Sequence, residues 1–203
     1  MTAIRKSGSF CAYTWDGKLT DPLDAEFAGL LAAQRFRHID LAASEEVSAG
    51  WVTQADPSGG SFDLEDLDAG PATWLRVRVD TKKLPGERVK QRMAEWRREH
   101  GKPPTARQRR EIKDALAEEL LPKQLPTTKN IDALLYAERR IVLLFAAGKS
   151  ARETFGKLWL ESFGMPLEAL GPREMALRSV EAPDVEVVEK LEPTRWPVAR
   201  RAS

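Results

Sequence analysis

The stretch from residue 84 to residue 122 reads LPGERVKQRMAEWRREHGKPPTARQRREIKDALAEELLP and predicts two helices joined by a short turn. Apolar residues recur at helical spacing in its first half, at Val89, Met93 and Trp96. Gly101 is typical of the residue that follows a helix C-terminus, and Pro103-Pro104 prevents the helix from continuing. The first helix is therefore expected to end just before Gly101.

The second helix of this stretch has its own start and stop signals. Thr105 is placed to cap the helix, and Gln108 completes a capping box three residues later. Pro122 stops the helix, whose apolar line consists of Ile112, Leu116 and Leu120. The pattern predicts a helical hairpin over residues 82–128.

This hairpin is the most basic part of the chain. Between Lys82 and Lys113 only four acidic residues oppose the cations, namely Glu87, Glu95, Glu99 and Glu111. The cations are Lys82, Lys83, Arg88, Lys90, Arg92, Arg97, Arg98, Lys102, Arg107, Arg109, Arg110 and Lys113. Such a concentration is the electrostatic footprint of a polyphosphate partner, and it is equally the composition of a solvated surface helix.

The whole chain has the composition of an ordinary globular protein. Its 203 residues are 42% hydrophobic and 31% charged, with a formal net charge of +1. The segment from Asp21 to Gly70 is acidic, so the mean hides a strong charge asymmetry. Cys11 is the only cysteine, and no signal core or membrane-length apolar run is visible. We expect a cytoplasmic, soluble protein that does not enter a membrane.

Short strand patterns lie on both sides of the hairpin. Strands are expected at Phe10–Trp15, Phe36–Asp40 and Trp74–Asp80, the last of which alternates apolar and polar residues. Ile131–Tyr136 and Ile141–Phe145 predict a β-hairpin with a longer or bulged loop, because the residues between them include no Gly, Asn or Asp. On the polar face of the third strand, Arg76 and Arg78 would stand together and either extend a basic surface or be solvated.

Two further helices complete the predicted body. Asp21 and Pro22 would begin the first, which buries Leu23, Phe27, Leu30 and Leu31. Ser150 and Glu153 would form a capping box at the start of the second, which carries Phe155, Leu158 and Trp159 and ends at Gly164-Met165-Pro166.

These elements predict an α+β fold. Residues 1–81 and 129–175 form an antiparallel sheet body with packed helices, and 82–128 form a projecting basic helical hairpin. Residues 176–203 form a C-terminal extension, with an edge strand around Val185, Val187 and Val188 and a basic tail from Arg195.

The usual catalytic and metal-binding patterns are absent from the sequence. Gly148-Lys149-Ser150 follows a strand as a P-loop does, but Leu143 stands where the first glycine of that motif is required. His38 and His100 have no partner at metal-ligand spacing. The acidic residues of the polar loop from Asp56 to Gly70 lack calcium-loop spacing. We expect no metal, no cofactor and no enzymatic activity.

Ordered motifs along the chain resemble the bacterial recombination-associated protein RdgC family. The resemblance covers roughly residues 10–172 and depends on the order in which the motifs occur. They are Gly50-Trp51-Val52, Lys83-Leu84-Pro85 with Val89, Glu111-Ile112-Lys113-Asp114, Leu120-Leu121-Pro122-Lys123 and Phe163-Gly164-Met165-Pro166.

The resemblance implies a homodimer closed into a ring whose positively charged hole encircles duplex DNA. It also implies binding without sequence preference, which restrains the RecA recombinase by occupying its substrate, and a nucleoid location. Lys102 corresponds to a basic position in the family's hairpin turn, and Leu121 and Leu125 correspond to its dimer contact. The family's chains continue beyond the residue where this sequence stops, so a ring, an open dimer and a monomer all stay open.

The leading hypothesis is a non-enzymatic protein of this type that binds duplex DNA through a set of basic residues. These are Arg76, Arg78, Lys90, Arg92, Arg97, Arg98, Lys102, Arg107, Arg109, Arg110 and Lys113. A protein-interaction module whose hairpin grips an acidic partner is the alternative. A nuclease that uses the acidic residues from Asp63 to Asp68 is a third hypothesis.

Overall fold

A computed structural model describes residues 9–40, 45–146, 148–179, 187 and 190. Contacts divide the chain into two compact units, Met1–Glu168 and Ala169–Ser203. The first unit holds most of the sheet together with the helical hairpin. The second includes helix α6 (Pro172–Ser179).

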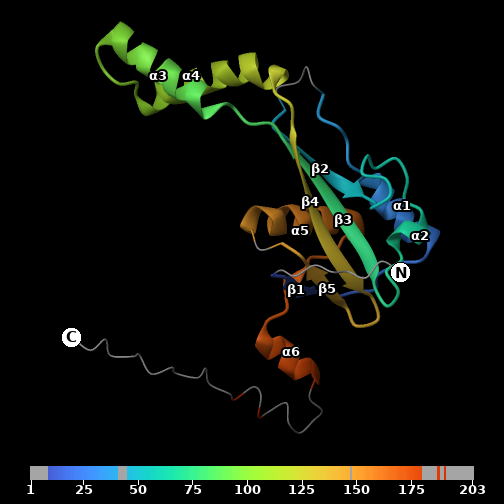
Figure 1. Cartoon of the computed structure of the whole chain (residues 1–203). Coiled ribbons are helices and arrows are strands. Elements are labelled where there is room, and N and C mark those ends of the chain that lie inside the picture. The colour runs from blue at the N-terminus through green and yellow to red at the C-terminus, as the bar shows by residue number, and fades with distance from the viewer. Residues whose placement is uncertain (1–8, 41–44, 147, 180–186, 188–189, 191–203) are drawn as a thin grey trace. The chain divides into compact units, whose positions relative to one another are not determined.

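Within the described residues the strands form one six-stranded sheet in the order β2-β3-β4-β5-β1-β6. The bounds are Cys11–Thr14 for β1, Val47–Val52 for β2, Thr73–Thr81 for β3, Thr127–Tyr136 for β4, Ile141–Leu144 for β5 and Glu168–Ala169 for β6. The pairs β2–β3, β3–β4, β4–β5 and β1–β5 are antiparallel. With helix α5 packed on this sheet (Figure 1), the predicted α+β fold is confirmed.

One face of the sheet carries the hydrophobic core. Leu75 and Val77 of β3 are fully buried, as the alternation in that strand predicts. Helix α5 (Lys149–Phe163) contributes Phe155 and Trp159 to the same cluster. Trp51 of β2 lies edge-on to Phe155, and its Nε1 donates a 2.7 Å hydrogen bond to Ser162 Oγ. The aromatic residues of α5 therefore hold that helix against the sheet.

The predicted β4–β5 hairpin is confirmed, including the longer connection. Four residues, 137–140, join the strands, and Arg140 has a φ of 51°. A left-handed residue at the end of the loop lets the chain return into β5 without a glycine.

Helix α1 (Ala25–Ala33) begins later than the sequence predicted. Asp24, not Asp21, is the N-cap, and its side chain accepts from the backbone N–H of Glu26. Asp21 instead accepts from the N–H of Leu23, which forms a turn before the helix. Leu23 is consequently exposed rather than part of the buried stripe, whereas Phe27 and Leu31 are buried as expected.

The strand predicted at Phe36–Asp40 is wrong. Only an isolated bridge joins Arg35 to Trp51, and the chain then leaves the sheet edge. Phe36 donates its N–H to the Trp51 carbonyl, and its backbone runs directly over Gly50. The apolar residues that suggested a strand are buried because this segment covers the sheet, not because it extends it.

Two local predictions also need correction. The polar loop after Asp56 includes a short helix, α2 (Leu64–Leu67), whose Leu67 is buried. Helix α5 begins at Lys149 with Gly148 at the N-cap and no side-chain cap, so Ser150 lies inside the first turn. Lys149 pairs with Glu153 at 3.6 Å, which uses the carboxylate that the capping box required. The helix ends at Gly164, as predicted.

The predictions for the C-terminal extension are mostly untested. Val185, Val188 and the basic tail from Arg195 lie outside the described residues, whereas Val187 is described and is helical and exposed, not part of a strand.

The close approach of Phe36 to β2 gives the first testable prediction. A Cβ added at Gly50 would lie 2.4 Å from Phe36 Cα, so backbone would have to move. Gly50→Ala is expected to lower the free energy of unfolding by about 1–3 kcal/mol in urea denaturation. Gly29→Ala in α1 is the matched control, because no atom lies within 4 Å of its added Cβ. The control should be neutral or stabilising by up to about 1 kcal/mol. Equal effects at the two glycines would contradict the packing of Phe36.

Candidate nucleic-acid interface

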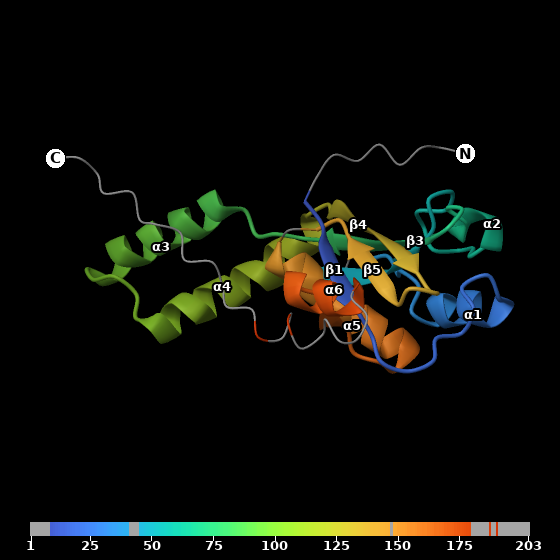
Figure 2. The same cartoon turned by 90° about the horizontal axis from the view of Figure 1, so that it is seen from below.

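The basic stretch forms the predicted hairpin of helices α3 (Gly86–His100) and α4 (Ala106–Leu120). Both helices extend past the ends of β3 and β4 (Figures 1 and 2). Gly101 has a φ of 70° and donates to the Arg97 carbonyl at 2.9 Å. The Thr105–Gln108 capping box is present. The turn residues therefore act as the sequence predicted.

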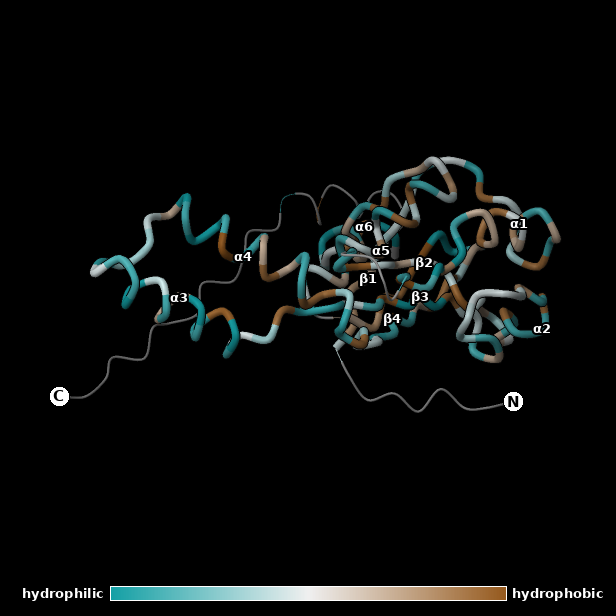
Figure 3. Tube along the Cα trace, turned by 90° about the horizontal axis from the view of Figure 1, so that it is seen from above, coloured by the Kyte–Doolittle hydropathy of each residue, from teal (hydrophilic) through white to brown (hydrophobic). Residues whose placement is uncertain are grey.

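Little of the hairpin is buried. Among its two helices, all of whose residues are described, α3 has no buried residue and α4 has Ile112 alone. Val89, Met93 and Trp96 are half-buried. Hydrophilic residues dominate the hairpin in Figure 3. Most of its surface is therefore available to a partner.

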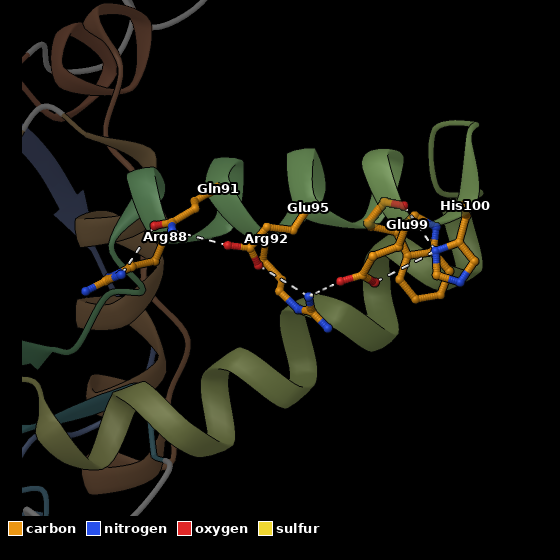
Figure 4. Close-up of polar contacts among 7 residues, drawn as sticks. Arg88, Gln91, Arg92, Glu95, Glu99 and His100 are labelled. Carbon is orange, nitrogen blue, oxygen red and sulfur yellow. Dashed lines mark hydrogen bonds and ion pairs between the residues drawn. The ribbon is translucent and has the colours of Figure 1, made fainter.

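Several cations of the hairpin lie in exposed ion pairs. Lys90 pairs with Glu87 at 2.8 Å, and Arg107 pairs with Glu111 at 2.8 Å. Arg92 lies between Glu95 and Glu99, at 3.3 Å and 3.5 Å (Figure 4). Exposed pairs of this kind contribute about 0–1 kcal/mol, so a phosphate could replace the carboxylate at small cost.

Five other predicted contact residues are exposed and make no hydrogen bond or ion pair with the described part of the chain. They are Arg97, Arg98, Lys102, Arg110 and Lys113. Arg109 differs from them, because its Nε donates to the Pro104 carbonyl at 3.0 Å and so ties α4 to the turn. The five residues are the strongest candidates for an anionic ligand.

Arg76 and Arg78 lie on the sheet and are held in ion pairs. Arg76 Nε lies 2.5 Å from Asp132 Oδ1, and Asp132 is buried. Arg78 donates to both carboxylate oxygens of Asp80 and lies over the Phe36 ring at 4.4 Å. Both arginine side chains are less than one-fifth exposed. This arrangement favours a structural role over a part in the basic surface.

The contacts of Asp80 with Arg78 and Thr128 change the pKa of its carboxyl group. Burial alone would raise the pKa of Asp80, but hydrogen bonds from Arg78 and Thr128, with the charge of Arg78, hold that pKa below its ordinary value. The side chain therefore stays ionised and continues to bind Arg78.

Lys82 does not contribute to the basic surface, although it belongs to the basic stretch. Its side chain is buried, and Nζ donates to the Asp40 carbonyl at 3.0 Å. The sequence held a signal for this placement, because the alternation that puts Arg78 and Asp80 on one face of β3 continues to Lys82. The number of cations in the stretch does not by itself predict that Lys82 is buried.

Of the two leucines expected at a dimer contact, Leu121 is buried and Leu125 is exposed. Leu121 is 1% exposed and packs within its own chain, in the 3₁₀ turn η1 (Leu121–Lys123). It lies where α4 returns to the sheet, so it is at the base of the hairpin and not at its far end (Figure 1). Leu125 is 80% exposed.

Carboxylates of the polar loop from Asp56 to Gly70 accept hydrogen bonds from nearby residues. Asp66 accepts from Thr53 Oγ1, Asp63 accepts from Ser61 Oγ, and Asp68 accepts from the N–H of Gly70. Hydrogen bonds from Ser58, with those from Ser61 and Gly60, lower the pKa of Asp56 to about 2. In the part of the chain that the structure describes, no group of three or more His, Cys, Asp or Glu side chains could hold a metal ion. None of the described helices is long and apolar enough to cross a membrane.

Comparison with known proteins identifies the family. A family model described as "Putative exonuclease, RdgC" matches residues 13–177. The chain belongs to the RdgC family. Recombination-associated proteins RdgC of Xylella fastidiosa strains M12 and 9a5c are each 35% identical to it over 89 residues. Those matches cover 42% of this chain and 30% of each relative, so the chain aligns with less than a third of the length of these RdgC proteins.

The distinction between structural and free cations in this RdgC-family chain can be measured. Arg76→Met leaves the buried Asp132 without its guanidinium, and we expect the free energy of unfolding to fall by about 2–3 kcal/mol. Arg98→Met, which removes the same charge from an exposed helix position, should change it by less than about 0.5 kcal/mol. Urea denaturation of both variants is the measurement. A smaller loss at Arg76 than at Arg98 would contradict the assignment.

Proposed function

We propose that this recombination-associated family member binds DNA without sequence preference through the α3–α4 hairpin. The observation that carries the proposal is the set of five exposed cations, Arg97, Arg98, Lys102, Arg110 and Lys113, that have no partner among the described residues. Lys and Arg neutralise phosphates and release condensed counterions, which drives binding that does not depend on sequence. No recognition-helix motif argues for base readout.

The proposed role in recombination follows from the protein covering the DNA that it binds. A protein that covers duplex DNA along its phosphates withholds that DNA from the RecA recombinase, at the nucleoid and without any catalytic step. An acidic protein partner for the same hairpin remains the alternative, because it would meet the same exposed cations.

The test is binding of a random-sequence duplex across a salt series. Log affinity should fall with log salt with a slope of about −0.9 for each phosphate neutralised, and duplexes of different sequence should bind alike. Arg97→Glu/Arg98→Glu/Lys102→Glu should abolish measurable binding. The wild-type and variant proteins should show the same helix content by circular dichroism.

Two outcomes of this experiment would contradict the proposal. Lack of binding by the wild-type protein at low salt would favour the acidic-protein partner. Magnesium-dependent degradation of the duplex, lost in Asp66→Ala, would favour a nuclease.

The homodimer is a separate proposal that now depends on Leu125 without Leu121. An 80% exposed leucine next to the hairpin base is an apolar contact that a second copy could cover. We expect the molecular mass in sedimentation to rise with protein concentration, and Leu125→Asp to keep the protein monomeric. Exposed Leu160→Asp, on α5, is the matched control and should leave association unchanged. A wild-type protein that stays monomeric throughout would exclude this contact.

A further inference from the structure

The two sides of the hairpin carry different charges. In α3, Arg88, Arg92, Glu95 and Glu99 follow each other at i, i+4, i+7 and i+11, so they form one row along the helix. In α4 the same spacing gives the row Arg107, Glu111, Asp114 and Glu118. Figure 4 shows the α3 row along one side of that helix, with Arg92 between its carboxylates.

A second pair of rows holds no acidic residue. It comprises Lys90, Ala94 and Arg97 on α3 and Ala106, Arg110, Lys113 and Ala117 on α4. The members of these rows are exposed, apart from the half-buried Ala117. Arg97, Arg110 and Lys113 make no hydrogen bond or ion pair with the described residues, and Lys90 pairs only with the highly exposed Glu87.

Helix geometry places each pair of rows on a common side. The half-buried Val89 and Trp96 of α3 and the buried Ile112 of α4 mark where each helix meets its neighbour. In two antiparallel helices, residues that come just after such contact positions share one side, and residues that come just before them share the other. Lys90, Arg97 and Lys113 come just after, whereas Arg88, Glu95 and Glu111 come just before.

The hairpin therefore has a basic face, made of the acid-free rows, and a mixed face, made of the other two rows. The basic face has four cations, and the one carboxylate beside them is Glu87, which pairs with Lys90. The mixed face has three cations and five carboxylates. Three alanines on the basic face leave room between the long side chains, so a phosphate backbone can approach the helices closely.

We propose that, of the two faces of the hairpin, DNA contacts the basic face, and that the mixed face is turned away from the phosphates. This inference rests on the proposed function and divides the cations of the two faces into two groups. Lys90, Arg97, Arg110 and Lys113 bind phosphate, whereas Arg88, Arg92 and Arg107 hold the helices through local hydrogen bonds and ion pairs. A phosphate near the mixed face would meet five carboxylates and be repelled.

The test compares two triple variants that each remove three positive charges. Arg97→Gln/Arg110→Gln/Lys113→Gln changes the basic face, and Arg88→Gln/Arg92→Gln/Arg107→Gln changes the mixed face. Gln has a helix propensity close to those of Arg and Lys, so both variants should keep the helices, as circular dichroism would check. The ligand is a short random-sequence duplex, measured over a salt series.

The basic-face variant should lose affinity on the order of 100-fold near 0.1 M salt, with the salt slope reduced by about 2.7. The mixed-face variant should change affinity by less than about threefold and keep the wild-type slope. Equal losses in the two variants would overturn the inference while leaving DNA binding by the hairpin intact. A wild-type protein that fails to bind would overturn the proposed function itself, and this inference with it.

A gain of binding provides a check that does not depend on losing side chains. Ala94→Lys adds a cation to the basic face, and Ala115→Lys adds one beside Glu111 on the other side. Ala94→Lys should strengthen binding and steepen the salt slope by about 0.9, and Ala115→Lys should do neither. Stronger binding by Ala115→Lys than by Ala94→Lys would contradict the orientation.

Discussion

The hairpin depends on the antiparallel pairing of β3 with β4. Their register runs from Thr73 opposite Leu135 to Thr81 opposite Thr127 without interruption. One strand leads into α3, and the other receives the chain from α4, so this ladder fixes where α3 begins and where α4 ends. Because the hairpin buries little of its own, these anchored ends must hold its two helices together.

The same two strands explain why the cations of the chain divide into two kinds. On β3, Arg76 and Arg78 are close to buried carboxylates, and just after β3 the buried Lys82 donates to a carbonyl. Removing Arg76 or Arg78 would take the cation away from a buried carboxylate in a low-dielectric environment. The hairpin cations are in water, where an ion pair contributes little and an anionic ligand can compete. Position relative to the sheet therefore separates the cations that are held in buried contacts from those that are exposed.

Sequence patterns predicted the elements that local signals define and failed where tertiary contacts decide. The Gly101 and Thr105 caps, the β3 alternation and the aromatic stripe of α5 all follow from spacing within a few residues. The segment Phe36–Asp40 has strand composition, but its burial comes from lying over Gly50, which no local pattern records. Leu121 has the apolar character of an interface residue, and only the return of the chain to β4 shows that it is internal.

The two faces of the hairpin have opposite effects on the stability of its helices. Pairs such as Arg92–Glu95 and Arg107–Glu111 each stabilise an isolated helix by about 0.2–0.5 kcal/mol. Like charges three residues apart, as at Arg110 and Lys113, oppose helix formation by a similar amount. With so little apolar burial in the hairpin, a helix carrying only the cations would be poorly stable. The ion pairs on the mixed face offset the repulsion on the basic face, so Arg97, Arg110 and Lys113 can stand without an ion-pair partner among the described residues.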